Sequence, residues 1–301
     1  MLSSADIVKR AREIGKAVPA FNIPYLPMMA PVVQAVADTD SFSLIEVARL
    51  EWTKFEAGGP GAVMEEYRKY EKPAHVRLHL DHVPVIDEDN QNVDYMGIIR
   101  EAINLGYHSV MVDASRLDLD GNISATSNVT SAAHAAGIAC EAELGAVFGH
   151  SDGPMPPYEE LFRSGKGFTD VDEAARFVSK TGCDWLSVAF GSIHGAISKA
   201  TRDQKKLEAR LDLEHLGRLS AATKIPLVLH GGSGVRHADV LAAMERGIAK
   251  INVGTEIRQS YEVALRETGS VAEAQKATYE RTAWVIKDHL KVAGLRAALE
   301  G

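Results

Sequence analysis

Several features are scarce or missing in this 301-residue sequence. It has two cysteines, Cys140 and Cys183, and no CxxC pair, so a disulfide framework is not expected. It has no run of Lys or Arg, and its net charge of −8 argues against unaided nucleic-acid binding. No segment reaches the roughly 18 apolar residues of a membrane span, and residues 1–6 do not resemble a signal peptide. We therefore expect a soluble cytoplasmic protein with no nucleic-acid or membrane partner.

The remaining composition is that of a globular chain, 46% hydrophobic and 25% charged. Strand-like and helix-like segments alternate along its length, which predicts a single (β/α)₈ TIM-barrel domain over residues 1–301. The eight candidate strands are Val18–Asn22, Ser43–Val47, Ala74–Leu80, Ser109–Asp113, Ile138–Glu143, Trp185–Ala189, Leu227–His230 and Lys250–Val253.

Glycines mark where the predicted helices end and the next strands begin. Four helical stretches end in glycine shortly before a strand, as expected for left-handed helix caps, at Gly106, Gly137, Gly182 and Gly247. Two stretches interrupt this alternation. The Gly- and Pro-rich loop 144–169 follows the fifth strand and is predicted to lie on the active face as a lid, or else to be a disordered insertion. Helices over 255–267 and 271–290 begin a C-terminal extension (268–301) suited to capping or subunit contact.

Three histidines, His82, His194 and His230, each lie just past a short apolar run. Such runs are typical of buried parallel strands, whose carboxyl ends meet at the catalytic face of a barrel. Three imidazoles at that face would bind one Zn²⁺ and leave a position open for substrate. Side chains alternate along a strand, so His82 faces away from His79 and Asp81 unless the strand has already ended. If the strand ended at Asp81, the His82 side chain would be free to turn toward the mouth of the barrel, the open end at the carboxyl ends of the strands.

Two carboxylates, Asp113 and Glu143, also end predicted strands. They are candidates to orient the imidazoles from behind or to provide an alternate metal position. Hydrogen bonding within the rim alone is the alternative for each.

Glycine-containing turns follow the last two predicted strands, at 231–234 and 252–255. Loops in these two places are the common phosphate site of such barrels. Backbone N–H groups and polar side chains there suit phosphate oxygens, and Gly195 beside His194 adds another close backbone approach. The candidate phosphate-binding residues are therefore Gly195, Gly231, Gly232, Ser233, Asn252, Gly254 and Thr255. A metal beside such a site predicts a small phosphorylated substrate.

Together these segments resemble the class II, zinc-dependent fructose-bisphosphate and tagatose-bisphosphate aldolases. The resemblance extends in family order from near the start to about residue 260. It rests on Ala20-Phe21-Asn22, Leu78-His79-Leu80-Asp81-His82, Glu141-Ala142-Glu143-Leu144-Gly145, Gly191-Ser192-Ile193-His194-Gly195, His230-Gly231-Gly232-Ser233-Gly234 and Asn252-Val253-Gly254-Thr255.

The resemblance implies a carbon–carbon lyase that reversibly forms dihydroxyacetone phosphate and an aldehyde through a metal-stabilised enediolate. It implies Zn²⁺ on His82, His194 and His230, and Asp81 as the proton-transferring group. Asn22 would lie near the substrate, and the phosphate would be held by Gly195, Gly232, Ser233, Asn252 and Thr255. A monovalent cation (Na⁺ or K⁺) near the phosphate and a homodimer or homotetramer are also expected.

The sequence departs from the family pattern around the aldehyde half of the site. Glu46-Val47-Ala48 replaces Gln-x-Ser and is followed by Arg49 and Glu51. Asp113-Ala114-Ser115-Arg116 replaces Asp-Gly-Ser-His. His150-Ser151 precedes the Asp-Gly pair of the loop where some relatives have acids, and an Asp-Pro-Arg stretch is absent around 268–275. We therefore expect a substrate other than fructose 1,6-bisphosphate, such as tagatose bisphosphate or another sugar or sugar-acid phosphate. Arg49 and Arg116 either face an acidic aldehyde end or form surface salt bridges.

Three other functions remain open at this point. A Schiff-base aldolase would need a lysine, but Lys250 starts its predicted strand at the wrong end and Lys199 lies in a loop. A metal-dependent hydrolase or isomerase on the same barrel would release no aldehyde. A catalytically silent sugar-phosphate binding barrel would not need Asp81.

Overall fold

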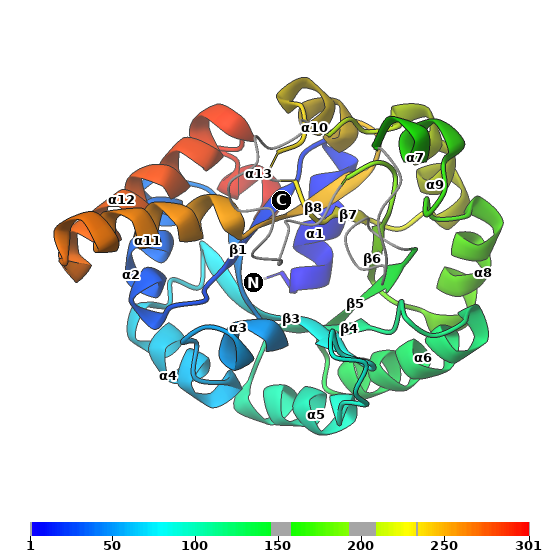
Figure 1. Ribbon diagram of the computed structural model, residues 1–301, viewed down its shortest axis with the longest axis horizontal. Helices are drawn as coiled ribbons and strands as arrows, with labels where there is room; N and C mark the ends of the chain where they lie inside the picture. The colour runs from blue at the N-terminus through cyan, green and yellow to red at the C-terminus, as the bar shows by residue number, and fades with distance from the viewer. Residues whose placement is uncertain (1, 146–157, 193–208, 233, 301) are drawn as a thin grey trace.

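The computed structural model describes residues 2–145, 158–192, 209–232 and 234–300. Its parallel strands pair in chain order and close where β8 pairs with β1 (Figure 1). The predicted (β/α)₈ barrel is therefore confirmed. The strands are β1 (Val18–Asn22), β2 (Ser43–Ala48), β3 (Val76–Pro84), β4 (Ser109–Asp113), β5 (Ala139–Leu144), β6 (Trp185–Val188), β7 (Leu227–Leu229) and β8 (Ile248–Val253).

The helices lie outside the barrel, most of them in a ring around it (Figure 1). They are α1 (Ser4–Glu13), η1 (Leu26–Met28), α2 (Met29–Asp38), α3 (Arg49–Thr53), α4 (Pro60–Tyr70), α5 (Tyr95–Leu105), α6 (Leu119–Ala135), α7 (Tyr158–Ser164), α8 (Val171–Thr181), α9 (Leu213–Thr223), α10 (His237–Met244), α11 (Thr255–Thr268), α12 (Val271–Trp284), the π-helical turn η3 (Val285–His289) and α13 (Arg296–Glu300). Among the described residues, no helix is long and apolar enough to cross a membrane.

The glycines predicted to end helices all have positive φ angles. Gly106 and Gly182 are the left-handed caps of α5 and α8, and Gly137 and Gly247 precede β5 and β8 with φ of 73° and 112°. A Cβ on Gly247 would lie 2.3 Å from Ser220 Oγ, so this glycine also permits a close approach of two elements. The helix–glycine–strand repeat was therefore interpreted correctly.

Two interruptions of the repeat differ in part from the prediction. Residues 146–157 of the expected lid lie outside the described residues, while Tyr158–Ser164 forms α7 instead of irregular chain. In the C-terminal extension, the helix expected over 271–290 is α12 up to Trp284 and continues as the π-helical turn η3.

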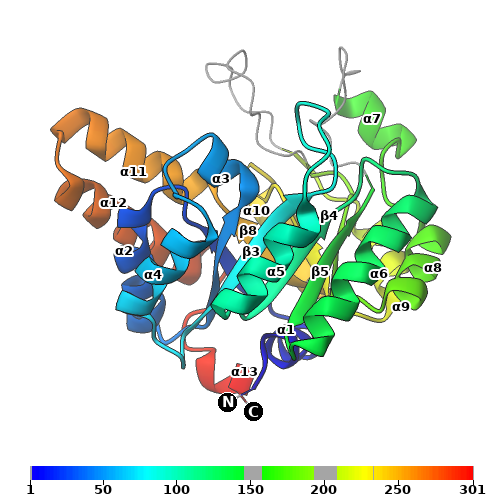
Figure 2. The ribbon, with the colours of Figure 1, turned by 90° about the horizontal axis from the view of Figure 1, so that it is seen from below.

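The two ends of the barrel have different roles. Helix α1 covers the amino-terminal end, where its side chains Ile7, Val8 and Ala11 join an apolar cluster with Val18 and Trp185 from the barrel interior. Figure 2 shows α1, α13 and both termini at this end, and α7 at the opposite end. The carboxyl ends of the strands point toward α7, which leaves that mouth available for chemistry.

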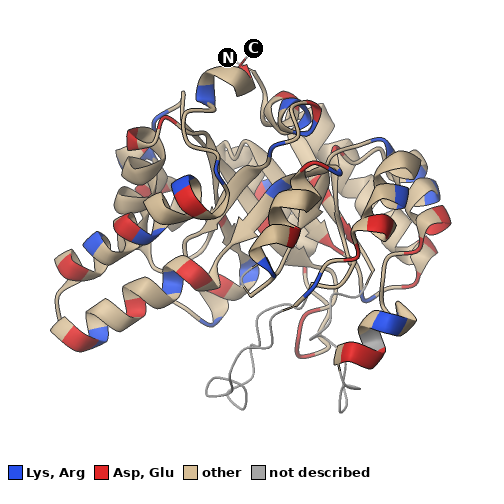
Figure 3. Cartoon of the chain, turned by 90° about the horizontal axis from the view of Figure 1, so that it is seen from above, with Lys and Arg blue, Asp and Glu red and all other residues tan. Residues whose placement is uncertain are grey.

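The barrel interior carries charge, whereas TIM-barrel interiors are usually filled by branched apolar side chains. Charged or polar residues at 0% exposure include Glu46, His79, Glu141 and Lys250. In the view of Figure 3, acidic and basic residues are interspersed over the outer helices, so the buried charges are a separate group inside the barrel. Buried ionisable groups persist when they pair with one another, which directs attention to what they support.

Candidate active site

Strand β3 brings two candidate site residues to the mouth by means of a β-bulge. Its register with β4 shifts between Leu80 and Val83, and His82 has a φ of +27°. A bulge adds one residue to a strand and changes the direction of the local side chains. The strand was predicted to end by Asp81, but it continues to Pro84. The bulge, and not strand termination, therefore places His82 beside Asp81 at the mouth.

His230 follows β7 and lies close to His82. Their ring centroids are 4.6 Å apart with an interplanar angle of 62°. One ligand atom from each of Asp81, His82 and His230 lies within 4.8 Å of the other two, which is compatible with a shared metal ion. The third predicted ligand, His194, lies outside the described residues.

Two carboxylates lie behind these imidazoles, as the strand-end pattern suggested. His82 Nδ1 is 3.3 Å from Asp113 Oδ2 and 3.9 Å from Glu143 Oε2, and His230 Nδ1 is 3.3 Å from Glu143 Oε2. Burial opposes the charge on His82, but Asp81, Asp113 and Glu143 outweigh it and raise the pKa of the imidazole well above its usual value. The mouth is therefore a strongly negative region that favours a bound cation.

Asp81 is held by two side-chain amides. Asn22 Nδ2 donates to its Oδ2 at 3.0 Å, and Asn252 Nδ2 donates to its Oδ1 at 3.2 Å. Burial opposes ionisation, but His82 and Lys250, with smaller contributions from other histidines, lower the pKa of Asp81 to about 2. Asp81 is therefore a fixed, ionised carboxylate at neutral pH.

Lys250 occupies the middle of the barrel beneath Asp81. Its Nζ is 3.1 Å from Glu46 Oε2 and 2.9 Å from Glu141 Oε2, and it donates to Asn252 Oδ1 at 2.7 Å. Placing Lys250 at the start of β8 was wrong, because that strand begins at Ile248. Burial disfavours the charged form of the Lys250 side chain, but the nearby Glu141 and Glu46 carboxylates outweigh burial and raise the pKa of Lys250. A lysine held as a cation is a poor Schiff-base nucleophile, which argues against that mechanism at this residue.

Replacing Lys250 with methionine should therefore destabilise the protein strongly. The change leaves Glu46 and Glu141 buried without their cation, a loss of about 3–5 kcal/mol in the free energy of unfolding. Denaturant titration measures this loss. The matched control is Lys276→Met on α12: this lysine is exposed and forms no ion pair with any described residue, so only a small change is expected. A Lys250→Met protein as stable as the wild type would contradict the pairing.

Glu141 connects the buried network to the mouth, a role that sequence reasoning did not assign. Its Oε1 lies 2.9 Å from His230 Nε2, and its Oε2 accepts from Trp185 Nε1 and lies 3.4 Å from His79 Nε2. With Nε2 engaged by Glu141, His230 presents Nδ1 toward Glu143 and the mouth. A signal was present in the sequence: ionisable residues alternate at 79 and 81 and at 141 and 143, which puts each pair on one face of its strand.

Glu51 is a second carboxyl close to Asp81. It is 9% exposed, and its Oε2 accepts from the Ala48 backbone N–H at 2.8 Å. Burial, with a smaller contribution from Asp81, raises the pKa of Glu51 to about 8, although the Ala48 N–H and the Asn22 side chain oppose the shift. Glu51 is therefore largely protonated at neutral pH.

Glutamine at position 51 should change how stability depends on pH. Between the ordinary pKa of 4.5 and about 8, the unfolded wild type ionises Glu51 while the folded protein retains the proton. The contribution of this group to stability is present below that window and is lost as the pH rises through it. Glu51→Gln stays neutral, so its stability relative to wild type should rise by about 1 kcal/mol or more from pH ~5 to ~8. Denaturant titrations at both pH values, with Glu280→Gln as an exposed control, test this; a constant difference would contradict it.

Arg49 and Arg116 both contact Asp87 on the rim of the barrel. Arg49 Nη1 lies 3.4 Å from Asp87 Oδ2, and Arg116 donates to the Asp87 carbonyl oxygen at 2.7 Å and to Asn90 Oδ1 at 2.8 Å. Both arginines thus pair with the loop after β3, as in the salt-bridge alternative.

The predicted phosphate loops lie next to Asp81. Gly231 has a φ of +69°, and a Cβ on Gly254 would lie 3.1 Å from Asn22 Oδ1, so both turns favour glycine. Thr255 begins α11, whose first N–H groups suit an anion. Asn252, predicted to bind phosphate, donates to Asp81. Gly195 and Ser233 lie outside the described residues.

Comparison with known proteins agrees with this site. Residues 2–295 match the family described as fructose-bisphosphate aldolase class-II. The chain is 33% identical over 273 residues to a probable fructose-bisphosphate aldolase of Bacillus subtilis, covering 89% of this chain and 86% of that protein. It is similar to the crystal structure of the YdjI aldolase from Escherichia coli K12, with a TM-score of 0.76, 30% identity, and coverage of 98% and 99% of the two chains. A putative fructose-1,6-bisphosphate aldolase from Coccidioides immitis gives a TM-score of 0.76 at 26% identity, covering 98% of each chain.

The fold and the family match together define an aldol-cleaving enzyme, a carbon–carbon lyase. The chain belongs to the class II fructose-bisphosphate aldolase family.

Proposed function

We propose that this chain is a zinc-dependent ketose-phosphate aldolase that reversibly releases dihydroxyacetone phosphate and an aldehyde. The observation that supports it is the approach of His82, His230 and Asp81 ligand atoms within 4.8 Å at the barrel mouth. Imidazole nitrogens backed by carboxylates are a donor set that Zn²⁺ accepts, so the residues present fit the ion. His82 and His230 would hold it, with His194 as the proposed third ligand.

When bound, Zn²⁺ supplies a Lewis acid that polarises the substrate carbonyl. Asp113 and Glu141 orient the His82 and His230 rings through their contacts with ring nitrogens. Asp81, ionised and fixed by two amides, accepts the proton of the substrate hydroxyl as the carbon–carbon bond breaks. In the synthetic direction it returns that proton to the oxygen of the aldehyde.

The substrate phosphate is proposed to lie at the turns after β7 and β8. Backbone N–H groups of Gly231, Gly232 and Gly254, together with the first turn of α11 at Thr255, would donate to its oxygens. Gly195 and Ser233 are proposed to complete this set, with a monovalent cation nearby. Asn252 is proposed to contact the phosphate and Asn22 to lie near the substrate, and both also hold Asp81.

The aldehyde half is proposed to differ from that of fructose 1,6-bisphosphate. Glu46, which replaces the Gln of the family pattern, is buried against Lys250, and Arg49 and Arg116 surround Asp87 on the rim. We propose a tagatose-type or acidic sugar-phosphate substrate in its place.

A screen of aldehydes with dihydroxyacetone phosphate, with metal content measured in parallel, tests the proposal. We expect aldol product with at least one aldehyde, about one zinc per chain, and loss of activity on chelation that zinc restores. Activity that survives chelation but not borohydride treatment with substrate would favour a Schiff base. Ligand binding without turnover would favour a sugar-phosphate binding protein. Light scattering tests the predicted homodimer or homotetramer.

A further inference from the structure

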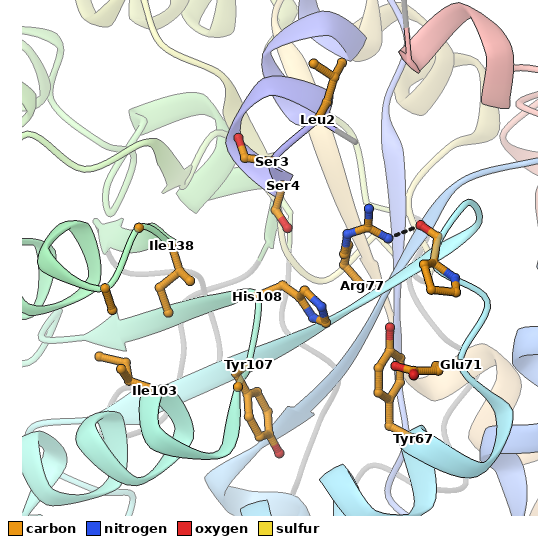
Figure 4. Close-up of a pocket in the computed structure, with 14 residues that line it drawn as sticks. Leu2, Ser3, Ser4, Tyr67, Glu71, Arg77, Ile103, Tyr107, His108 and Ile138 are labelled. Carbon is orange, nitrogen blue, oxygen red and sulfur yellow. Dashed lines mark hydrogen bonds between the residues drawn. The ribbon is translucent and has the colours of Figure 1, made fainter.

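A cavity of about 480 Å³ opens at the amino-terminal end of the barrel, opposite the proposed active site. It lies between the start of α1 and the segments that lead into β3, β4 and β5 (Figure 4). One part of its wall is polar, formed by Ser4, Arg77 and His108, and another is apolar, formed by Ile103 and Ile138. The proposed aldolase mechanism uses none of these residues.

Ser4 provides the observation that points to a ligand. The residue is 3% exposed, and its Oγ is buried with no hydrogen-bond partner among the residues that the structure describes. Figure 4 shows the hydroxyl directed from α1 toward the space beside Arg77 and His108. A buried hydroxyl without a partner is unfavourable, and such groups are normally satisfied by a water, an ion or a ligand.

His108 and Arg77 make this space suitable for an anion. The Leu78 backbone N–H donates to His108 Nδ1 at 3.0 Å, so the neutral ring carries its hydrogen on Nε2 as a donor. Burial and the nearby Arg77 lower the pKa of His108 to about 4, so the neutral form dominates at neutral pH. Arg77 is 7% exposed, with one guanidinium nitrogen bonded to the carbonyls of Pro73 and Val76, and it brings a fixed positive charge to the cavity wall.

We propose that this cavity binds a small carboxylic acid with an apolar body. The carboxylate accepts hydrogen bonds from the Ser4 hydroxyl and His108 Nε2 and is attracted by the Arg77 charge. The apolar body packs against Ile103, Tyr107 and Ile138 on the other part of the wall. Glu71 lines the same cavity, so its carboxylate disfavours a dianion such as phosphate and selects a monoanion.

The test is calorimetric titration of the metal-loaded protein with benzoate, with its neutral isostere benzamide and with inorganic phosphate. Benzoate should bind saturably and at least about tenfold more tightly than the other two. Ser4→Ala and His108→Asn should each weaken benzoate binding about tenfold. The asparagine can still accept from the Leu78 N–H, and neither residue belongs to the proposed catalytic site, so aldolase activity should be unchanged.

His82→Ala distinguishes this cavity from the metal site, because benzoate could also bind a metal. Retained benzoate binding in His82→Ala, together with weakened binding in Ser4→Ala, supports the cavity. The proposal is overturned if benzoate does not bind saturably, if binding is lost in His82→Ala, or if it is unchanged in both Ser4→Ala and His108→Asn. It is also overturned if benzamide or phosphate binds as tightly. None of these results bears on the proposed aldolase function, which the aldehyde screen tests separately.

Discussion

Replacing His82 or His230 with alanine should remove the metal and lower kcat/KM by about a thousandfold or more. The two rings lie 4.6 Å apart and share the mouth with Asp81, so each variant loses a direct ligand of the proposed ion. A thousandfold loss is about 4 kcal/mol of transition-state stabilisation, within the several kcal/mol that a metal Lewis acid contributes. Elemental analysis and a coupled aldehyde assay measure the two effects.

The matched control for these variants is His134→Ala. His134 lies on the outer helix α6, pairs with Asp184 and is half-exposed, so its loss should leave metal content and turnover unchanged. If either mouth variant retained full activity without metal, zinc-dependent catalysis by this chain would be refuted.

Changing Asp81 to asparagine should lower kcat by about a thousandfold, a typical contribution of a positioned acid or base, with the zinc content unchanged. Asparagine has nearly the same shape but cannot take up the proton that the hydroxyl must lose. His82 and His230 stay in place, since their buried contacts are with Glu141, Glu143 and Asp113. Steady-state kinetics with metal analysis separates lost proton transfer from lost metal.

Asp6→Asn is the control for the Asp81 variant. Asp6 caps α1 at the opposite end of the barrel, and asparagine there should not change kcat. An Asp81→Asn enzyme that had lost its zinc would contradict this prediction and show that Asp81, one of the three clustered groups, acts as a metal ligand.

The barrel itself could be predicted from sequence because local signals, such as helix-ending glycines, bound several of its strands. Gly106 and Gly182 end helices for a purely backbone reason, and short buried apolar runs follow them. The rim positions of Asp113 and Glu143 also followed from strand ends. In these cases the neighbouring residues alone contain the information.

The buried charged residues beneath the site could not be predicted in the same way. The contacts of Lys250 with Glu46 and Glu141 join strands far apart in the chain, and no local pattern determines which buried charges meet. The bulge at His82 was missed because a one-residue register shift with β4 is a property of the paired strands, not of either sequence alone. The hydrogen bond from Asn252 to Asp81 was not predicted for the same reason: the two residues are 171 positions apart.

The left-handed backbone at His82 has a consequence for engineering the metal preference. Asparagine and aspartate tolerate positive φ better than most residues, whereas β-branched side chains do not. An oxygen ligand could therefore replace the imidazole at this position without disturbing the strand. Such a change would move the centre toward harder ions such as Mn²⁺ or Mg²⁺, so position 82 is a natural starting point for an aldolase with a different metal.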